Sequence, residues 1–257
     1  MRRAIPWLGL LLLAISFAWF VRPPGPTAPV ARSASPPPRG ERSLLVVLDP
    51  GHGGDDSGAI CGTVLEKDLA LDVALQAELL LRAAGFATAL TRTSDRHVSL
   101  AERASLGNRE ENSLFISIHF NDGARAAASG IETYYAARSA GRPGWFSWLP
   151  FLQRTETDSV AAKSESLAGF IQEALVERTQ AVNRGVKAEQ FYVIANVRHP
   201  AALVEGGFLT NKSEVAKLAT AEYRAQIARA ISDGVVRYRQ ARRPAGTTLA
   251  LAESRPE

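Results

Sequence analysis

Hydrophobic and polar positions along the middle of this chain form blocks that predict strands followed by helices. An apolar run from Leu44 to Leu48 ends abruptly in a glycine-rich turn, residues 49–54 (DPGHGG). A second apolar run, Leu114 to Ile118, is followed at once by His119. A short apolar run bounded by such signals is typical of a buried strand. Two strands that each end at a histidine are therefore predicted.

Helical spacing of apolar residues follows the first of these turns. From Glu66 to about Ala84 apolar residues recur every three or four positions, and Gly85 is a stop signal. Residues 99–102 (SLAE) form a capping-box pattern that predicts a helix to about Glu110. The remaining pattern predicts helices over 164–181, 212–218 and 221–239, and strands over 86–91, 130–136, 191–194 and 201–204.

This alternation of strands and helices indicates the fold class. It predicts one α/β domain, residues 43–240, with a mixed, largely parallel twisted sheet flanked by helices. Residues 241–257 read as a flexible tail. Residues 59–64 read as a loop.

Residues 137–163 break the rhythm. They contain glycines and prolines with tryptophan, phenylalanine and leucine among them. Because the segment is longer than a usual connection, we expect an insertion that is either functional, as a lid, or poorly ordered. A membrane-facing loop is the alternative, since tryptophan and phenylalanine suit a bilayer interface.

The N-terminal pattern predicts a targeting signal. Arg2 and Arg3 precede 18 uncharged residues, Ala4 to Val21. This stretch is long for the core of a signal peptide and just long enough to span a membrane. We expect residues 1–21 to be a signal peptide or an inner-membrane anchor, and favour the anchor because no clean small-x-small cleavage site follows Phe20. Residues 22–42 then form a proline-rich linker. The remainder is predicted to be exported to the cell envelope, in the periplasm.

Charge argues against nucleic acid as the main partner. The chain has a net charge of +4, but residues 1–42 hold six arginines and one glutamate, which leaves the remainder at −1. Phosphate binding needs basic residues clustered on a folded surface. The single cysteine, Cys61, excludes an internal disulfide and a multi-cysteine metal site.

Four residues that can carry chemistry stand at predicted strand ends or at a helix start. His52, His119 and Glu205 each follow a strand, and Glu66 opens the first long helix. Ligands bind beyond the carboxyl ends of strands in open α/β sheets. Two imidazoles and a carboxylate form a known catalytic zinc arrangement, in which zinc makes water more acidic. A second carboxylate must then accept a proton and pass it to a leaving amine, and Glu205 is the candidate.

Each of these residues also has a structural interpretation. Glu66 can simply suit the helix macrodipole, His119 can be a core histidine bonded to backbone, and Glu205 can pair with an arginine. Spacing alone leaves both interpretations open.

Six motifs in order resemble a known family, the zinc-dependent N-acetylmuramoyl-L-alanine amidases (family 3) that split bacterial septal peptidoglycan. The resemblance runs over about Leu45 to Arg239. The motifs are residues 49–54 (DPGHGG), 66–68 (EKD), 91–92 (TR), 117–119 (SIH), 183–187 (NRGVK) and 204–211 (VEGGFLTN).

The resemblance implies one zinc ion held by His52, Glu66 and His119, with Glu205 as the catalytic carboxylate. It implies hydrolysis of the amide between the lactyl group of N-acetylmuramic acid and L-alanine of the stem peptide. Two departures are Phe120, where the family often has alanine, and Cys61 in the loop before Glu66. We expect Cys61 to be inert rather than an extra zinc ligand.

Further residues are assigned with less support from the pattern. Asn121 and His199 are expected to contact substrate. Arg184, with Lys187, is expected to hold either a substrate carboxylate or a structural acid. Arg92 and Arg103 are expected to form structural pairs, and His97 to lie in a solvated loop.

The resemblance also bears on partners. Related amidases carry an insertion near this point that resembles a regulatory helix, which blocks the zinc site until an activator protein relieves it. By this resemblance residues 137–163 are a lid, and an unstructured or membrane-facing loop is the equal alternative. The protein is expected to be a monomer. The alternatives are a zinc amidohydrolase that cuts another amide and a non-catalytic peptidoglycan-binding protein.

Overall fold

A six-stranded sheet forms the centre of the protein. The computed structural model describes residues 44–123, 125–137 and 150–242, with side chains from residue 159 onward in the last range. The strand order is β4-β1-β5-β8-β6-β7. The strands are β1 (Leu45–Pro50), β4 (Ala87–Leu90), β5 (Ser113–Asn121), β6 (Ile131–Tyr135), β7 (Asn183–Ala188) and β8 (Ala201–Phe208). The first four in the order run parallel, β6 runs antiparallel to β8, and β7 runs parallel to β6.

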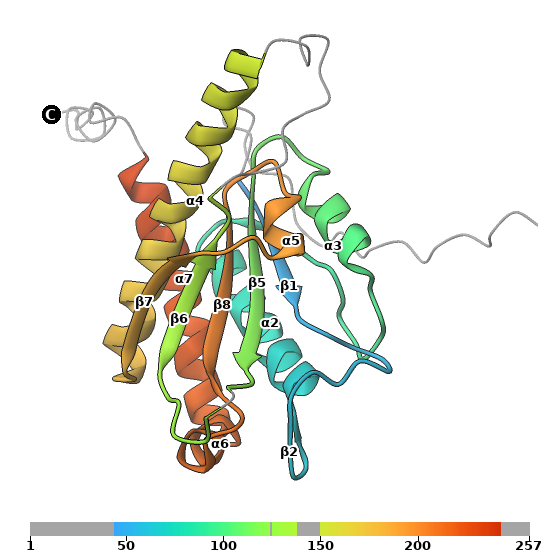
Figure 1. The fold of residues 1–257 in the computed structure, drawn as a ribbon, viewed down its shortest axis with the longest axis vertical. Coiled ribbons are helices and arrows are strands. Elements are labelled where there is room, and N and C mark those ends of the chain that lie inside the picture. Colours follow the sequence, from blue (N-terminus) through green and yellow to red (C-terminus); the bar gives the residue numbers. More distant parts are fainter. Residues whose placement is uncertain (1–43, 124, 138–149, 243–257) are drawn as a thin grey trace, which may run out of the picture. The chain divides into compact units, whose positions relative to one another are not determined.

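Helices cover both faces of this sheet (Figure 1). Three long helices pack on one face, namely α2 (Glu66–Ala83), α4 (Pro150–Thr179) and α7 (Ala221–Ala241). The short helices α3 (Leu100–Gly107) and α5 (Tyr192–Ala195) pack on the other. A further helix, α6 (Lys212–Leu218), follows β8. The predicted fold class, a mixed and largely parallel sheet between helices, is confirmed.

The central strands are apolar throughout because both of their faces are covered. Side chains alternate along β5, so that Ile116 and Ile118 pack against the three-helix face while Phe115 packs against α3 and α5. All three are fully buried. Each such side chain contributes roughly 1.5–3 kcal/mol when it leaves water. This burial fixes the strands relative to one another, and therefore also fixes their carboxyl ends, where the site lies.

Three local predictions are wrong. A strand was expected at residues 191–194, but Tyr192–Ala195 form the single helical turn α5. Short apolar runs do not distinguish a strand from a buried helical turn. Residues 183–188 form the edge strand β7, which the pattern did not indicate because its residues are mostly polar or glycine. The expected loop at 59–64 contains a hairpin, β2 (Ile60–Cys61) with β3 (Val64–Leu65).

Helix α4 also begins earlier than predicted, at Pro150 rather than residue 164. Proline is well suited to the first position of a helix, where its missing N–H group is not needed. Part of the predicted insertion, residues 137–163, is therefore helix, and residues 138–149 lie outside the described part of the chain.

The elements on either side of residues 138–149, β6 and α4, both contact the amino end of β8. Tyr134, near the end of β6, is paired with Leu203, and the backbone N–H of Ala201 donates to the Ser164 hydroxyl of α4 at 3.1 Å. Glu205 stands further along β8, toward the opposite edge of the sheet. The predicted lid falls largely on residues outside the described part of the chain, so it stays a prediction.

The predicted anchor, residues 1–21, and the linker, residues 22–42, lie outside the described residues, as does most of the tail. Among the helices that the structure describes, none has the length and apolar character needed to cross a bilayer.

Candidate metal centre

Three side chains from separate elements meet at the carboxyl ends of β1 and β5. His52 follows β1, His119 lies within β5, and Glu66 is the first residue of α2. Glu66 Oε1 lies 3.0 Å from His52 Nε2 and 2.9 Å from His119 Nδ1. One ligand atom from each residue lies within 4.8 Å of the others. The sequence placed His119 after its strand, whereas β5 continues to Asn121 with an irregularity just past His119.

Glu66 is a buried carboxylate held by backbone donors. The N–H of Phe120 donates to Oε1 at 3.0 Å, and the N–H of Ala59 donates to Oε2 at 2.9 Å. Burial alone would raise the pKa of Glu66, but the contacts with His119 and His52 hold that pKa well below its usual range. Glu66 is therefore ionised and fixed in direction, which suits a metal ligand better than a surface helix charge.

Two buried arginines hold the turn that carries His52 through hydrogen bonds to its backbone carbonyl groups. Arg103 donates to the carbonyl of His52 at 2.6 Å and pairs with Asp49 at 2.8 Å. Arg92 donates to the carbonyls of Pro50 and Gly51 at 3.1 and 2.7 Å. Asp49 also accepts from the hydroxyls of two further residues, Thr91 and Ser117. The expected pair is confirmed for Arg103, while Arg92 instead satisfies carbonyl groups.

His52 adopts a backbone conformation that few non-glycine residues occupy, with φ of 58°. Such a conformation costs on the order of 1–3 kcal/mol and persists only where surrounding contacts impose it. The arginine contacts supply them. His52 Nδ1 also lies 2.9 Å from Asp56 Oδ2, which leaves Nε2 directed at Glu66. A carboxylate on the second ring nitrogen is the usual support for a metal-binding histidine.

Glu205 lies directly beside this cluster. Its Cα is paired with that of His119 across β5 and β8, so both side chains leave the same face of the sheet. Glu205 Oε2 is buried without a hydrogen-bond partner, and no arginine pairs with it in the described part of the chain. Burial, followed by the negative charges of Glu66 and Glu132, raises the pKa of Glu205 well above its usual range.

The donor set fits zinc. Two imidazole nitrogens and one carboxylate oxygen are the ligands of open, catalytic zinc sites, which keep a further position for water or substrate. Buried polar atoms without partners are rare and call for an explanation, and Glu205 Oε2 is such an atom beside the three donors. A reacting group at the open position would explain it.

Comparison with known proteins decides the family. Residues 46–237 match the N-acetylmuramoyl-L-alanine amidase family. The chain belongs to this family. It is 37% identical over 215 residues to the N-acetylmuramoyl-L-alanine amidase LytC of Bacillus subtilis, covering 84% of this chain and 39% of LytC. It is 30% identical over 253 residues to the germination-specific N-acetylmuramoyl-L-alanine amidase of the same organism, covering 93% and 96% of the two chains.

A solved amidase shares the fold. The N-acetylmuramoyl-L-alanine amidase from Clostridium difficile 630 superimposes with a TM-score of 0.67 at 31% identity, covering 79% of this chain and all of that one. The chain spans well under half of LytC but nearly all of the germination-specific enzyme and of the solved amidase. The family and the fold of this amidase are thereby established.

Two of the predicted substrate contacts of this amidase converge on one acid that the sequence did not single out. Asn121 donates to Glu132 Oε1 at 2.6 Å, and Arg184 Nε donates to Glu132 Oε2 at 2.7 Å. Glu132 is in turn paired with Glu205 across β6 and β8. Asn121 and Arg184 thus lie next to the amidase site. The position of Glu132 in mid-strand gave no signal of this role.

Other predicted residues stand apart from the amidase site. His199 precedes β8, at the end of that strand opposite Glu205. Six residues of strand span roughly 20 Å, so His199 does not join the cluster. His97 is exposed in its loop, as expected. Cys61 lies in the β2–β3 hairpin and is not among the described residues that converge as metal ligands.

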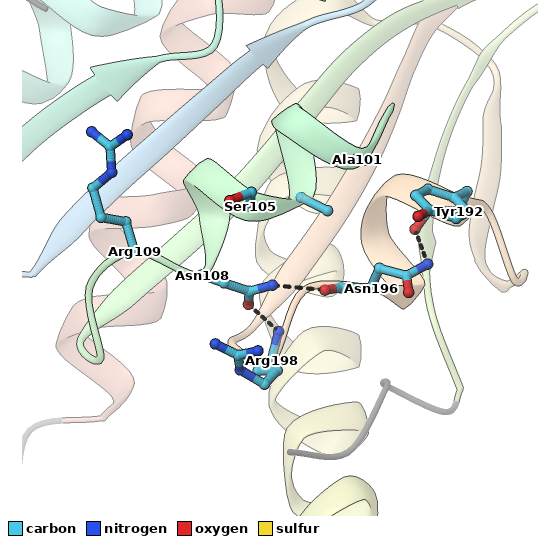
Figure 2. A pocket seen from close by; sticks show the side chains of 8 residues that line it. Ala101, Ser105, Asn108, Arg109, Tyr192, Asn196 and Arg198 are labelled. Carbon is cyan, nitrogen blue, oxygen red and sulfur yellow. Dashed lines mark hydrogen bonds between the residues drawn. The ribbon is translucent and has the colours of Figure 1, made fainter. Parts of the chain in front are cut away.

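A separate hollow opens between α3 and α5 of the amidase (Figure 2). Its volume is about 460 Å³, and its lining includes Asn108, Asn196 and Arg198. Asn108 donates to the carbonyl of Asn196 at 2.8 Å and accepts from the N–H of Arg198 at 2.7 Å. These bonds join two loops of the fold. None of the three metal-site residues lines the hollow.

Proposed function

We propose that this amidase uses one zinc ion, held by His52, Glu66 and His119, to hydrolyse the amide between the lactyl group of N-acetylmuramic acid and L-alanine in peptidoglycan. The observation that supports this most is the convergence of the three donors beside a buried, unpartnered Glu205. When bound, zinc supplies Lewis acidity, which polarises a carbonyl group and makes water more acidic.

Glu205 is the proton carrier in this proposal. As a carboxylate it accepts a proton from the attacking water, and it then delivers that proton to the nitrogen of L-alanine as the C–N bond breaks. Oε2 is available because it makes no other hydrogen bond. Burial, and after it the negative charge of Glu66, raises the pKa of Glu205. A cation bound to Glu66 would offset this negative charge and so favour the ionised form of Glu205, which is the form that can accept a proton.

The surrounding residues hold the reacting groups in place. Phe120 and Ala59 fix Glu66 through their backbone N–H groups, and Asp56 fixes the ring of His52. Such preorganisation lowers the cost of reaching the transition state, because the groups do not have to reorient during the reaction. The cell envelope as the working location, the anchor at residues 1–21 and an activator protein remain proposals.

Substitution of Glu205 by glutamine tests this function. We expect Glu205→Gln to retain one zinc per chain and to digest purified sacculi at least ~100-fold more slowly, since a general acid–base typically contributes 10²–10⁴-fold. Glu173→Gln, an exposed change on α4, is the matched control. Mass spectrometry of the products should show peptides with a free L-alanine amino group. Wild-type digestion by Glu205→Gln, or cleavage at another bond, would contradict the proposal.

A further inference from the structure

The row of side chains that crosses the sheet at Glu205 continues beyond it. His119 on β5 is paired with Glu205 on β8, and Glu205 is paired with Glu132 on β6. Residues directly opposite each other on neighbouring strands project from the same face. Glu132 is therefore on the metal-centre side of the sheet, one strand past the proposed proton carrier.

Glu132 is a buried carboxylate surrounded by donors. Its side chain is 3% exposed. Oε1 accepts from Asn121 and from the hydroxyl of Tyr134, at 2.6 and 2.8 Å, while Oε2 accepts from Arg184 and from Lys187. Burial alone would raise the pKa of Glu132, but Lys187 and Arg184 lower it to about 2. One negative charge is thus shared between two positive ones.

The two cations remain accessible. The side chains of Arg184 and Lys187 are 33% and 40% exposed, and Glu132 is their only ion-pair partner in the described part of the chain. Each is also placed against an aromatic ring, Arg184 with its guanidinium 4.8 Å from the centre of Phe208 and Lys187 5.7 Å from that of Tyr134. The group is held in place and has one positive charge in excess.

We propose that Arg184 and Lys187, positioned by Glu132, form an anion subsite that binds a carboxylate of the stem peptide. This inference rests on the proposed function. The peptide on the leaving side of the scissile amide carries carboxylates, and a guanidinium matches a carboxylate in shape and charge. Neighbouring strands lie about 4.8 Å apart, which puts β7 roughly 10 Å from Glu205.

That separation limits the bound carboxylate to two residues of the stem. An extended peptide advances ~3.5 Å per residue, so roughly 10 Å corresponds to two or three residues beyond the scissile amide. The subsite therefore takes the free carboxylate of the second or the third residue of the stem. Binding there would also orient the L-alanine nitrogen toward Glu205, because the peptide would be held at both ends.

Synthetic muramoyl tripeptides test the subsite. Three compounds are compared, one with free carboxylates on the second and third residues and two in which one or the other is a carboxamide. We expect the wild-type enzyme to lose at least 10-fold in kcat/KM for one carboxamide. Arg184→Gln should cleave all three at similar rates, and Arg184→Lys should recover part of the preference. Arg237→Gln, on α7 in an exposed pair with Glu177, should behave as wild type.

Binding provides a second readout that does not depend on turnover. Zinc-loaded Glu205→Gln should bind the free-carboxylate compound more tightly than that carboxamide in calorimetry, and adding Arg184→Gln should remove the difference. If Arg184→Gln does not fold, Lys187→Gln replaces it.

The outcomes separate the two proposals. The anion subsite would be overturned if the wild-type enzyme cleaved the three compounds equally and Glu205→Gln bound them equally. The amidase function would still stand. Cleavage of none of them, together with inert sacculi, would overturn the function, and the calorimetric difference would still decide the subsite. If the ion cluster is purely structural, Arg184→Gln would slow cleavage of all three compounds by the same factor and keep the wild-type preference among them, which also overturns the subsite.

Discussion

At the scale of single residues, the metal centre depends on positions that have no side chain. A Cβ on Gly51 would lie 2.3 Å from the ring of His119, and a Cβ on Gly58 would lie 2.5 Å from Glu66 Oε2. Neither approach is tolerated between real atoms, so a side chain at either position must displace a proposed zinc ligand. These glycines are required for space as much as for backbone freedom.

Gly58 and Gly62 offer a matched test of this requirement. Both have left-handed backbone, with φ of 62° and 61°, but a Cβ on Gly62 would meet nothing within 4 Å. Each change to alanine should cost about 1–2 kcal/mol of backbone strain. Only Gly58→Ala should also lower zinc affinity, by 10-fold or more, in a competitive chelator titration. Equal zinc affinity in the two variants would show that Glu66 adapts to the added methyl group.

The four chemical residues were predictable from sequence because each stands where a predicted strand ends or where a predicted helix begins. His52, Glu66 and His119 converge as expected, and Glu205 lies beside His119. Glu132 was not predictable, since its role depends on which strands flank β6 and on the direction of β7. His199 was misplaced for the converse reason. His199 is close to Glu205 in sequence, but because the residues between them form an extended strand, the two side chains lie far apart.

At the scale of elements, α4 and α7 approach closely where α7 lacks a side chain. A Cβ on Gly234 would lie 2.6 Å from the Cα of Ile171 on α4. These two helices, with α2, bury the core on the face of the sheet opposite the metal centre. The sequence predicted helices here but not their spacing, because a helix pattern shows which face is apolar and not how near its partner comes.

Two glycine-to-alanine changes should therefore have opposite effects. Gly234→Ala should destabilise the domain by about 1–3 kcal/mol, since a backbone atom of α4 cannot move aside easily. Gly169→Ala on α4, where a Cβ meets nothing within 4 Å, should stabilise it by about 0.5–1 kcal/mol. Urea unfolding monitored by circular dichroism measures both. Stabilisation by Gly234→Ala would mean that α4 and α7 are further apart than described.

Elements defined by neighbours rather than by local pattern were the ones that sequence missed. The edge strand β7 contains Gly185 and several polar residues, yet it pairs with β6 because that edge would otherwise expose unpaired backbone groups. Helix α5 is a single turn whose apolar residues Val193 and Ile194 pack under β8 and β5. Only the assembled sheet determines either conformation.

At the scale of the whole molecule, the excess of positive charge lies in a different part of the chain from the described core. Residues 1–42 carry the excess of positive charge, and the remainder has a net charge of −1. The core described above draws only on residues between Val46 and Tyr238. The domain should therefore not need the first 42 residues in order to fold.

Removing residues 1–42 tests this independence. The shortened protein should have the same melting temperature and zinc content as the full chain, within the error of calorimetry and metal analysis. It should also lose retention on a cation exchanger at pH 7, because its net charge is −1. A lower melting temperature would show that the first 42 residues contribute to the core.

The parallel order of β1, β5 and β8 has a kinetic consequence. Parallel neighbours cannot be joined by a tight turn, so His119 on β5 is far along the chain from the other two proposed ligands, 53 positions from Glu66. Contacts of such long range form slowly and late, after the crossover helices have closed large loops. An unfolded chain thus offers zinc no preassembled site. Bound metal would act by slowing the escape from the native state, and the folding rate would be set by the sheet.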